Sequence, residues 1–332
     1  MIYGLVLRVR HLLYDKGWKK SYSASVPTIC LGNIAAGGTG KTPHTELILR
    51  TLQEADKAAV LSRGYKRKSR GFQTVAPDDS AWRVGDEPLQ IAAKFPAVEV
   101  AVDKDRVRGC EKLALYGARV IVLDDAFQYR RLQADLNIVL VDYAKPIFKD
   151  RLLPWGRLRD LPSRIRKAQV VIVSKCPAEL SEEERADWRT RLKLTPSQQL
   201  FFTTLRHCTP KPVFPEGDSH YLYAKRLILI SGIANDTPLR KYLSDNYTLS
   251  RRLAFPDHHR FSRKDIKAIS AAAKENPIAC LMTTEKDAQR LRDCTNVPQN
   301  VHERLFYVPI EATFLTEEEA EAFTWTVRSI LK

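Results

Sequence analysis

A glycine-rich segment followed by a lysine and a threonine is the part of this sequence best suited to chemistry. It consists of Gly37, Gly38, Thr39, Gly40, Lys41 and Thr42, directly downstream of an apolar run. A strand that leads through such a turn into a helix directs backbone N–H groups and the helix dipole toward one point, where a triphosphate fits. Lys41 would reach the β- and γ-phosphates, and the Thr42 hydroxyl would ligate Mg²⁺. The segment predicts a phosphate-binding loop, although Ala35 replaces a glycine of the strict motif and an ordinary glycine-rich turn is the alternative.

Two adjacent carboxylates offer a metal site beside this loop. Asp124 and Asp125 directly follow the apolar residues 120–123. Ligands bind at the carboxyl ends of parallel strands, so these acids would emerge next to the loop, in position for Mg²⁺. Paired acids at a strand end also occur as helix caps and turns, and the metal interpretation therefore depends on the loop.

Two further segments carry groups suited to acid–base chemistry. Residues 85–88 contain Asp86, and residues 255–261 contain His258. A carboxylate hydrogen-bonded to an imidazole can be oriented and tuned as a general base, which activation of a substrate hydroxyl requires. Spacing alone does not show that the two side chains meet, and a turn and a surface loop are the alternative.

The elements that would position these groups alternate between strands and helices. The apolar, β-branched runs are residues 58–62, 98–102, 120–123, 138–141 and 170–173. This alternation predicts an α/β fold of the P-loop NTPase type, a mostly parallel sheet with helices on both faces. Residues 200–225 read as an extended linker or β-ribbon, followed by a second α/β unit. We therefore expect a P-loop domain over residues 1–205 and a smaller α/β domain over residues 206–332, whose last helix could pack back on the first.

The charge of the chain indicates an anionic partner. Lys and Arg number 54 against 39 Asp and Glu, a formal net charge of +15, and the basic residues cluster in residues 1–20, 63–70 and 145–167. Nucleic acid, an anionic membrane surface and a phosphorylated substrate all fit this excess, and a solvated surface is the alternative. The six cysteines show no metal or disulfide spacing, and no apolar run approaches the ~18 residues of a membrane span. These features predict a cytoplasmic protein.

A basic amphipathic helix is predicted over residues 2–18. Its apolar face consists of Ile2, Leu5, Val6, Val9, Leu12 and Leu13. Arg8, Arg10 and His11 fall on the flanks and reverse, and Trp18 follows, a composition typical of a helix that lies in a membrane surface. Packing on the sheet of the protein itself is the alternative.

Several motifs occur in a recognisable order along most of the chain, from about residue 3 to residue 290. They are Gly32-Asn33, Gly37-Gly38-Thr39-Gly40-Lys41-Thr42-Pro43, Leu61-Ser62-Arg63-Gly64-Tyr65, Gly85-Asp86-Glu87-Pro88, Asp124-Asp125-Ala126-Phe127-Gln128, Leu153-Pro154-Trp155-Gly156-Arg157-Leu158-Arg159, Phe255-Pro256-Asp257-His258-His259 and Thr284-Glu285-Lys286-Asp287. In this order they resemble the tetraacyldisaccharide 4′-kinase family, the P-loop lipid kinases of lipid A biosynthesis.

The resemblance implies a reaction and a location. The γ-phosphate of ATP, with Mg²⁺, would pass to the 4′-hydroxyl of an acylated glucosamine disaccharide 1-phosphate, giving lipid IVA. The enzyme would be a peripheral protein, expected to be a monomer, on the anionic cytoplasmic face of the inner membrane, and it would bind no nucleic acid. Two domains joined by a two-stranded linker would enclose the active site.

The resemblance also assigns roles by position. Asp86 would be the general base on the 4′-hydroxyl, paired with His258. Asp124 and Asp125 would organise the metal, and Asp125 would also act on the reacting groups. The remaining assignments are the loop from Gly37 to Thr42 with Gln128 for the nucleotide, Lys41 for catalysis, Thr42 for the metal, and Arg63, Tyr65, Arg157 and Arg159 for the substrate. Adenine contacts are predicted at Ser174-Lys175 or residues 284–287, each of which is otherwise a strand-end turn.

The sequence departs from the family pattern at a few positions. Ala126 and Tyr129 stand where glycine and histidine are expected, and Asp160 stands where glutamate is expected. Ala126 adds a methyl group to a tight turn, and Tyr129 removes a titratable ring, so no role is assigned at position 129.

Two other functions are compatible with parts of the sequence. A partition-type P-loop ATPase that binds DNA has a similar loop, but such loops usually carry a lysine where this chain has Ala36, and no helix-turn-helix pattern is found. A nucleotide-dependent membrane scaffold without transferase activity is the third possibility. The hypothesised pair of Asp86 and His258 argues against it, because a scaffold has no hydroxyl to deprotonate.

Overall fold

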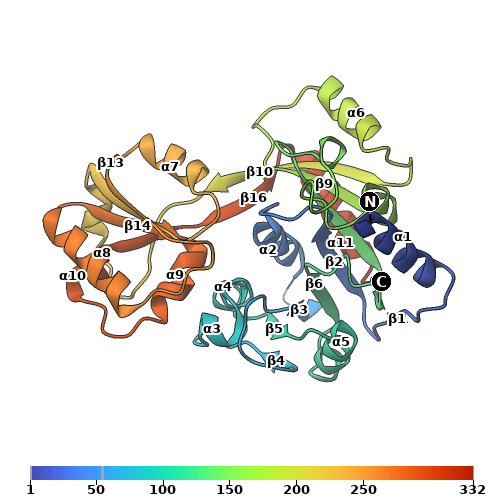
Figure 1. The fold of residues 1–332 in the computed structure, drawn as a ribbon, viewed down its shortest axis with the longest axis horizontal. Coiled ribbons are helices and arrows are strands. Elements are labelled where there is room, and N and C mark those ends of the chain that lie inside the picture. Colours follow the sequence, from blue (N-terminus) through green and yellow to red (C-terminus); the bar gives the residue numbers. More distant parts are fainter. Residues whose placement is uncertain (1, 54–55, 332) are drawn as a thin grey trace.

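The structure, a computed structural model, describes residues 2–53 and 56–331. Most strands in these residues belong to two sheets, which Figure 1 shows beside each other. The larger sheet has nine strands in the order β16-β10-β9-β8-β2-β6-β3-β5-β4, and the smaller has five in the order β11-β15-β14-β12-β13. The short strands β1 (Tyr22–Ser23) and β7 (Leu132–Gln133) pair separately.

The nine-stranded sheet is parallel except at its two edges. Its strands are β2 (Thr28–Asn33), β3 (Ala58–Ser62), β4 (Gln73–Thr74), β5 (Glu99–Val102), β6 (Val120–Asp124), β8 (Leu136–Asp142), β9 (Val170–Ser174), β10 (Gln199–His207) and β16 (Ile310–Phe314). The edge strands β4 and β16 are antiparallel to their neighbours. Central strands such as β6 and β9 are buried along their whole length, which explains their continuous apolar, β-branched sequences.

Helices divide the core of this sheet into two layers. The helices associated with it are α2 (Lys41–Thr51), α3 (Ala81–Val84), α4 (Asp86–Lys94), α5 (Arg106–Leu115), α6 (Glu182–Arg191) and α11 (Glu317–Ser329). Apolar side chains of α2, α4 and α11 share one core with Val60 and Val122. Those of α5 and α6 share the other with Leu61 and Leu123, because successive strand residues point to opposite faces.

Polar residues end the parallel strands at one edge of the sheet. Asn33 ends β2, Ser62 ends β3, Asp124 ends β6 and Ser174 ends β9. Because the carboxyl ends of parallel strands meet at the same edge, the fold collects these polar groups around the loop that follows β2.

The five-stranded sheet is likewise mostly parallel. Its strands are β11 (Lys211–Pro212), β12 (Arg226–Ser231), β13 (Thr248–Ala254), β14 (Cys280–Thr284) and β15 (Leu305–Val308), and its helices are α7 (Thr237–Ser244), α8 (Arg263–Glu275), α9 (Glu285–Arg292) and α10 (Gln299–His302). It has its own apolar clusters, which include Ile230 and Leu281 on one face and Leu229 and Met282 on the other.

An antiparallel ribbon formed by β10 and β16 connects the two sheets (Figure 1). Its pairing runs from Thr203 with Phe314 to His207 with Ile310. After β16 the chain forms α11 on the large sheet, where Phe323 is fully buried against Phe201 and Phe314. The division of the chain at residue 205 stays a prediction, and β10 extends across that position.

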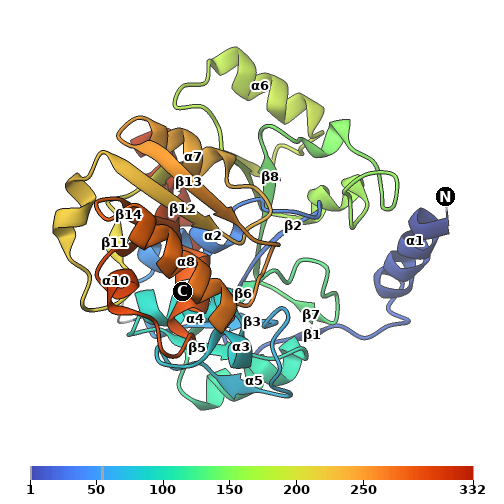
Figure 2. The same cartoon turned by 60° about the vertical axis from the view of Figure 1, so that its left-hand side comes forward.

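Helix α1 (Ile2–Asp15) lies at the margin of the molecule, away from the small sheet (Figure 2). It ends three residues before the expected limit, and Gly17 follows with a φ of 74°, a conformation that favours glycine after a helix. None of the described helices has the length and apolar character needed to cross a bilayer.

Gly32, in β2 directly before the phosphate loop, allows a close approach that any side chain would prevent. A Cβ atom at this position would lie 2.5 Å from Phe127 Cβ and 3.1 Å from the Phe127 backbone nitrogen. We therefore expect Gly32→Ala to lower the free energy of unfolding by about 1–3 kcal/mol, as overpacking of a core does. Urea unfolding would measure this change. Gly38→Ala, where nothing lies within 4 Å of the added atom, is the matched control for stability, and equal unfolding midpoints in the two variants would contradict the prediction.

Candidate active site

The predicted phosphate loop joins β2 to α2 at the polar edge of the large sheet. Gly40 caps α2 with a φ of 85°, which favours glycine. The Asn33 side chain donates a hydrogen bond to the Thr39 hydroxyl at 2.8 Å. Ser174 donates to the Thr39 carbonyl at 2.8 Å, and Lys175 donates to the Gly38 carbonyl. The loop is thus fixed by side chains from the ends of β2 and β9, which lie on either side of β8 in the sheet.

The two predicted metal carboxylates lie beside the start of α2. Lys41 Nζ is 3.7 Å from Asp125 Oδ2. Asp124 is almost fully buried and accepts a hydrogen bond from Ser62 at 3.1 Å. Burial, together with the neighbouring carboxylates of Glu87 and Asp125, raises the pKa of Asp124 to about 6. Such a carboxylate gains from a nearby cation, which would favour its ionised form.

These groups form a donor set that suits Mg²⁺. The Thr42 hydroxyl and the Asp124 carboxylate are both buried, and oxygen ligands are those that Mg²⁺ prefers. The described residues contain no cluster of three or more His, Cys, Asp or Glu that could hold a metal by itself. That agrees with a site of P-loop type, in which a hydroxyl and a carboxylate share the ion with phosphate oxygens.

Asp86 and His258 lie in segments that belong to different sheets, and a hydrogen bond joins them. Asp86 is the first residue of α4, and His258 lies in the loop after β13 with a φ of 59°. The His258 Nδ1 atom is 3.1 Å from Asp86 Oδ2. Burial would raise the pKa of Asp86, but the His258 hydrogen bond and the cations Lys286 and Arg290 lower it to about 2. Asp86 is therefore ionised at neutral pH, and Nδ1 donates to it.

Helix α9 places two cations beside the acids at the start of α4, a contact that the sequence does not predict. Lys286 forms an ion pair with Glu87, and Arg290 Nε lies 3.7 Å from Asp86 Oδ2. Arg290 also donates to the carbonyls of Gly232 and His259, both at 3.2 Å. The sequence predicted an adenine contact or a strand-end turn at residues 284–287, where the structure has the start of this helix. Nothing in the sequence connects Arg290 with Asp86.

The predicted nucleotide and substrate residues lie around these groups at different depths. Tyr65 is exposed, with its ring 5.4 Å from that of His258, and Arg63 is exposed nearby. Arg159 donates to Asp125 and Asn33, so it reaches the metal carboxylate. Arg157 lies farther out, in an ion pair with Asp150 at 2.8 Å. Gln128 donates to the Asn33 carbonyl at 2.5 Å.

The positions where the chain departs from the expected pattern are also occupied by contacts. The Tyr129 hydroxyl donates to Asp105 at 3.0 Å, and Asp105 caps α5. Asp160 is buried and accepts a hydrogen bond from His11 of α1 at 2.6 Å. Tyr129 therefore contacts the N-terminal cap of α5, and Asp160 attaches α1 to the protein next to the site.

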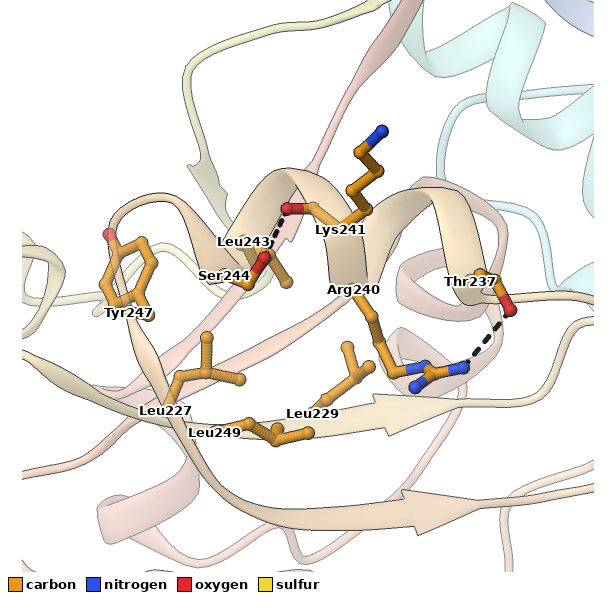
Figure 3. Close-up of a pocket in the computed structure, with 9 residues that line it drawn as sticks. All are labelled: Leu227, Leu229, Thr237, Arg240, Lys241, Leu243, Ser244, Tyr247 and Leu249. Carbon is orange, nitrogen blue, oxygen red and sulfur yellow. Dashed lines mark hydrogen bonds between the residues drawn. The ribbon is translucent and has the colours of Figure 1, made fainter.

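Two cavities differ in their chemistry. One, of about 290 Å³, is lined by Asp86, His258 and Tyr65 together with basic residues such as Lys66 and Arg260. The other, of about 320 Å³, lies between α7 and strands β12 and β13 (Figure 3). Its walls are mainly leucines, and its Arg240 is already paired with Asp236 at 3.1 Å. Only the first of these cavities contains a titratable pair that could activate a hydroxyl.

Comparison with known proteins identifies the family. The sequence profile of the family described as tetraacyldisaccharide-1-P 4′-kinase matches residues 1–328. The chain belongs to this family. It is 41% identical to the tetraacyldisaccharide 4′-kinase of Flavobacterium johnsoniae and 40% identical to that of Phocaeicola vulgatus, in each case over 96% of this chain and 92% or 90% of the relative. The crystal structure of LpxK from Aquifex aeolicus in complex with ATP aligns over 100% of this chain and 96% of its own, with a TM-score of 0.76 and 29% identity.

These findings confirm the main predictions from the sequence. The fold is the α/β fold of a P-loop kinase, and the enzyme is a lipid A 4′-kinase. Nothing among the relatives favours the DNA-binding ATPase. The roles of individual residues are not decided by this kinship and stay predictions.

A buried group of charges connects the phosphate-loop helix, the helix of Asp86 and the small sheet. Glu46 of α2 is fully buried, and its Oε2 atom lies 2.7 Å from Lys94 Nζ of α4. Lys94 Nζ is also 3.5 Å from Glu285 Oε1 of α9. Burial and the nearby carboxylate of Glu46 raise the pKa of Glu285 to about 7, against the opposing charge of Lys94.

The raised pKa of Glu285 makes stability depend on pH. Between the unfolded pKa near 4.5 and the folded pKa near 7, the folded state binds a proton that the unfolded state does not, so stability increases as pH falls through 7. We expect the melting temperature of the wild type to rise relative to Glu285→Gln between about pH 8 and about pH 6. Glu111→Gln removes an exposed carboxylate and is the control. A constant difference between wild type and Glu285→Gln across this range would contradict the assignment.

Proposed function

We propose that Asp86 is the general base that activates the 4′-hydroxyl of the disaccharide acceptor, with His258 as its orienting partner. The hydrogen bond between them, in a cleft that also contains Tyr65, is the observation that carries this proposal. Because Asp86 is ionised at neutral pH, it can accept a hydrogen bond from the acceptor hydroxyl and take its proton as the new P–O bond forms. His258 fixes the orientation of the carboxylate from the opposite side of the cleft.

We propose that the loop after β2 binds the phosphate donor. ATP is the phosphate donor, and the loop from Gly37 to Thr42 would hold its phosphates, with Lys41 neutralising charge on the transferred group. Thr42, Asp124 and Asp125 would hold Mg²⁺, which when bound neutralises phosphate charge. Arg159 keeps Asp125 in place, because both of its terminal nitrogens donate to that carboxylate. Gln128 would support the loop through its hydrogen bond to the Asn33 carbonyl, at the end of the strand that precedes the loop.

The acceptor is a lipid A precursor, a disaccharide that carries phosphate and acyl chains. We propose that Arg63 and Tyr65 contact its sugar headgroup, because Tyr65 lines the cleft beside His258 and Arg63, two residues earlier, is exposed. Arg157 and Arg159 would contribute positive charge on the other side. Contacts between the protein and parts of the acceptor far from the reacting hydroxyl would orient the 4′-hydroxyl, and phosphoryl transfer requires such positioning.

Helix α1 carries the proposed attachment to the cytoplasmic face of the inner membrane. Its polar side faces the protein: Tyr3 donates to the Arg159 carbonyl at 2.8 Å, Arg10 donates to the Gln128 carbonyl at 2.7 Å, and His11 bonds Asp160. Its apolar face is 49–81% exposed at Ile2, Leu5, Val6, Val9 and Leu12. An apolar stripe turned to solvent, with Trp18 and basic residues beside it, is suited to peripheral binding of an anionic bilayer by a monomer.

The neighbouring loop extends this surface. A Cβ atom at Gly4 would lie 3.0 Å from Leu152 Cδ1, so the loop that contains Leu152 packs directly against α1. In that loop Trp155 is 79% exposed. A tryptophan in this position is typical of residues that lie at a membrane–water interface, next to the site at which a lipid substrate would enter.

Replacement of Asp86 tests the proposed reaction. With radiolabelled ATP, Mg²⁺ and the disaccharide 1-phosphate in detergent, the wild type should form a labelled bisphosphate lipid. Asp86→Asn should lower turnover by roughly 10² to 10⁴ with little change in KM for ATP, as loss of a general base does. Asp78→Asn, an exposed acid in the preceding loop, is the matched control. Unchanged turnover in Asp86→Asn would reject the base assignment, and absence of lipid phosphorylation by the wild type would reject the reaction itself.

Replacement of exposed leucines tests the membrane proposal. Leu5 and Leu12 are exposed on α1, so Leu5→Ser with Leu12→Ser should leave folding intact. We expect partitioning onto vesicles of phosphatidylglycerol and phosphatidylcholine to fall at least about tenfold. The reason is that the variant loses two apolar side chains that the bilayer would otherwise cover. Cosedimentation would measure this. Leu115→Ser changes a leucine on α5 that is even more exposed and serves as the control. Equal vesicle binding of both variants would exclude α1 as the attachment.

A further inference from the structure

His44 is a buried histidine for which the proposed reaction has no use. It lies in the first turns of α2, shortly after Lys41 and Thr42, and it is fully inaccessible to solvent. Its Nδ1 atom is 2.7 Å from the Gly40 carbonyl oxygen, and its Nε2 atom is 2.8 Å from the Thr203 hydroxyl of β10. One ring therefore joins the last glycine of the phosphate loop to the ribbon that connects the two sheets.

The chemistry of the partners fixes the proton positions on this ring. A carbonyl oxygen only accepts, so Nδ1 carries the proton and donates it to Gly40. Burial lowers the pKa of His44 to about 4, so the ring is neutral and Nε2 is left with a lone pair. The Thr203 hydroxyl then donates to Nε2 at 2.8 Å, which is closer than its other acceptor, the Val173 carbonyl at 3.4 Å. Without this donor, the other tautomer would place a lone pair against the Gly40 carbonyl.

The loop is held at successive carbonyl groups, and His44 provides the last of these contacts. Lys175 binds the Gly38 carbonyl, Ser174 binds the Thr39 carbonyl, and His44 binds that of Gly40. When the carbonyl groups of a turn are fixed on one side, the conformation that directs its other groups at a ligand is fixed as well. Ser174 and Lys175 reach the loop from β9, whereas His44 is the contact that continues to β10.

The ribbon starts where His44 meets it. Thr203 is the first residue of β10 that pairs with β16, and it is fully buried. A Cβ atom at Gly40 would lie 3.5 Å from His44 Nδ1 and 3.6 Å from Leu205 Cδ1, so the glycine is packed between α2 and β10. Farther along α2, Arg50 lies 3.6 Å from Glu311 of β16. The loop and the start of the ribbon therefore form one packed unit.

We propose that His44 is a positioning residue for the phosphate loop, which it ties through Thr203 to the ribbon between the two sheets. The inference rests on the proposed binding of the ATP phosphates by this loop. It predicts that nucleotide affinity depends on a hydroxyl in β10 that touches neither the nucleotide nor the acceptor. Binding of the lipid acceptor does not depend on that hydroxyl.

Replacements of His44 and of its partner Thr203 test this proposal. His44→Phe removes both side-chain hydrogen bonds and leaves the backbone N–H of residue 44 on the Gly40 carbonyl at 3.2 Å. Thr203→Val removes the donor to Nε2 together with the longer contact of 3.4 Å to the Val173 carbonyl. The dissociation constant of Mg²⁺–ATP should rise roughly tenfold to hundredfold in each, the usual consequence of a buried hydrogen-bond partner left unpaired. KM for the lipid acceptor should not change. Thr203→Ser retains the hydroxyl and should restore affinity, and Thr204→Val, on the opposite face of the same strand, should bind as the wild type does.

The double variant separates a shared tether from two unrelated effects. If His44 acts through Thr203, then His44→Phe with Thr203→Val should bind ATP no more weakly than His44→Phe alone. Effects that multiply would overturn the proposal, as would a lowered melting temperature with ATP affinity within about twofold of the wild type. If His44→Phe does not fold, Thr203→Val and Thr203→Ser decide the question. Failure of the proposed function would differ, because the wild type itself would then not bind ATP.

Discussion

The contact between helices α4 and α9 is the constraint on which the proposed catalytic arrangement depends. Oppositely charged side chains cross it: Lys286 pairs with Glu87, Lys94 lies near Glu285, and Arg290 approaches Asp86. Asp86, Glu285 and Arg290 are buried. Removal of one partner from a buried pair costs about 3–5 kcal/mol because it leaves an uncompensated charge. The helices are therefore held in a register in which the first residue of α4 meets the loop that carries His258. Since α4 belongs to the large sheet and α9 to the small one, this contact also fixes how the sheets face each other.

The large sheet solves a different problem, the concentration of charge at one point. Its parallel strands end in polar residues at the edge where the phosphate loop begins, and each of these residues holds a neighbour. Ser62 holds Asp124, Asn33 holds Thr39, and Ser174 holds the loop carbonyl. A polar strand end would be costly if it were buried without a partner. Here the partners are the groups proposed to bind phosphate and metal, so the stability of the edge and the geometry of the proposed site depend on the same hydrogen bonds.

The sequence predicted the parts of this enzyme that are local. The glycine-rich loop, the β-branched strands and the acid pair are each encoded within a few residues, because turn conformation, strand burial and strand-end position all leave short-range patterns. Asp86 and His258 were paired only through the family resemblance, since they are 172 residues apart and no periodicity relates them. Arg290 was missed for the same reason. Its approach to Asp86 depends on how the two sheets meet, which no short-range pattern records.

Helix α1 shows the same limit in another form. Its periodicity defined an apolar face and a polar one, yet amphipathicity alone does not say which face the protein covers. The structure turns the polar face inward, and it does so through a residue of the site. The carbonyl oxygen of Arg159 accepts a hydrogen bond from the Tyr3 hydroxyl, and its guanidinium donates to Asp125. A displacement of the N-terminal helix would therefore reach Asp125 through the backbone and side chain of Arg159, which couples the helix proposed to meet the lipid to a carboxylate proposed to hold the metal.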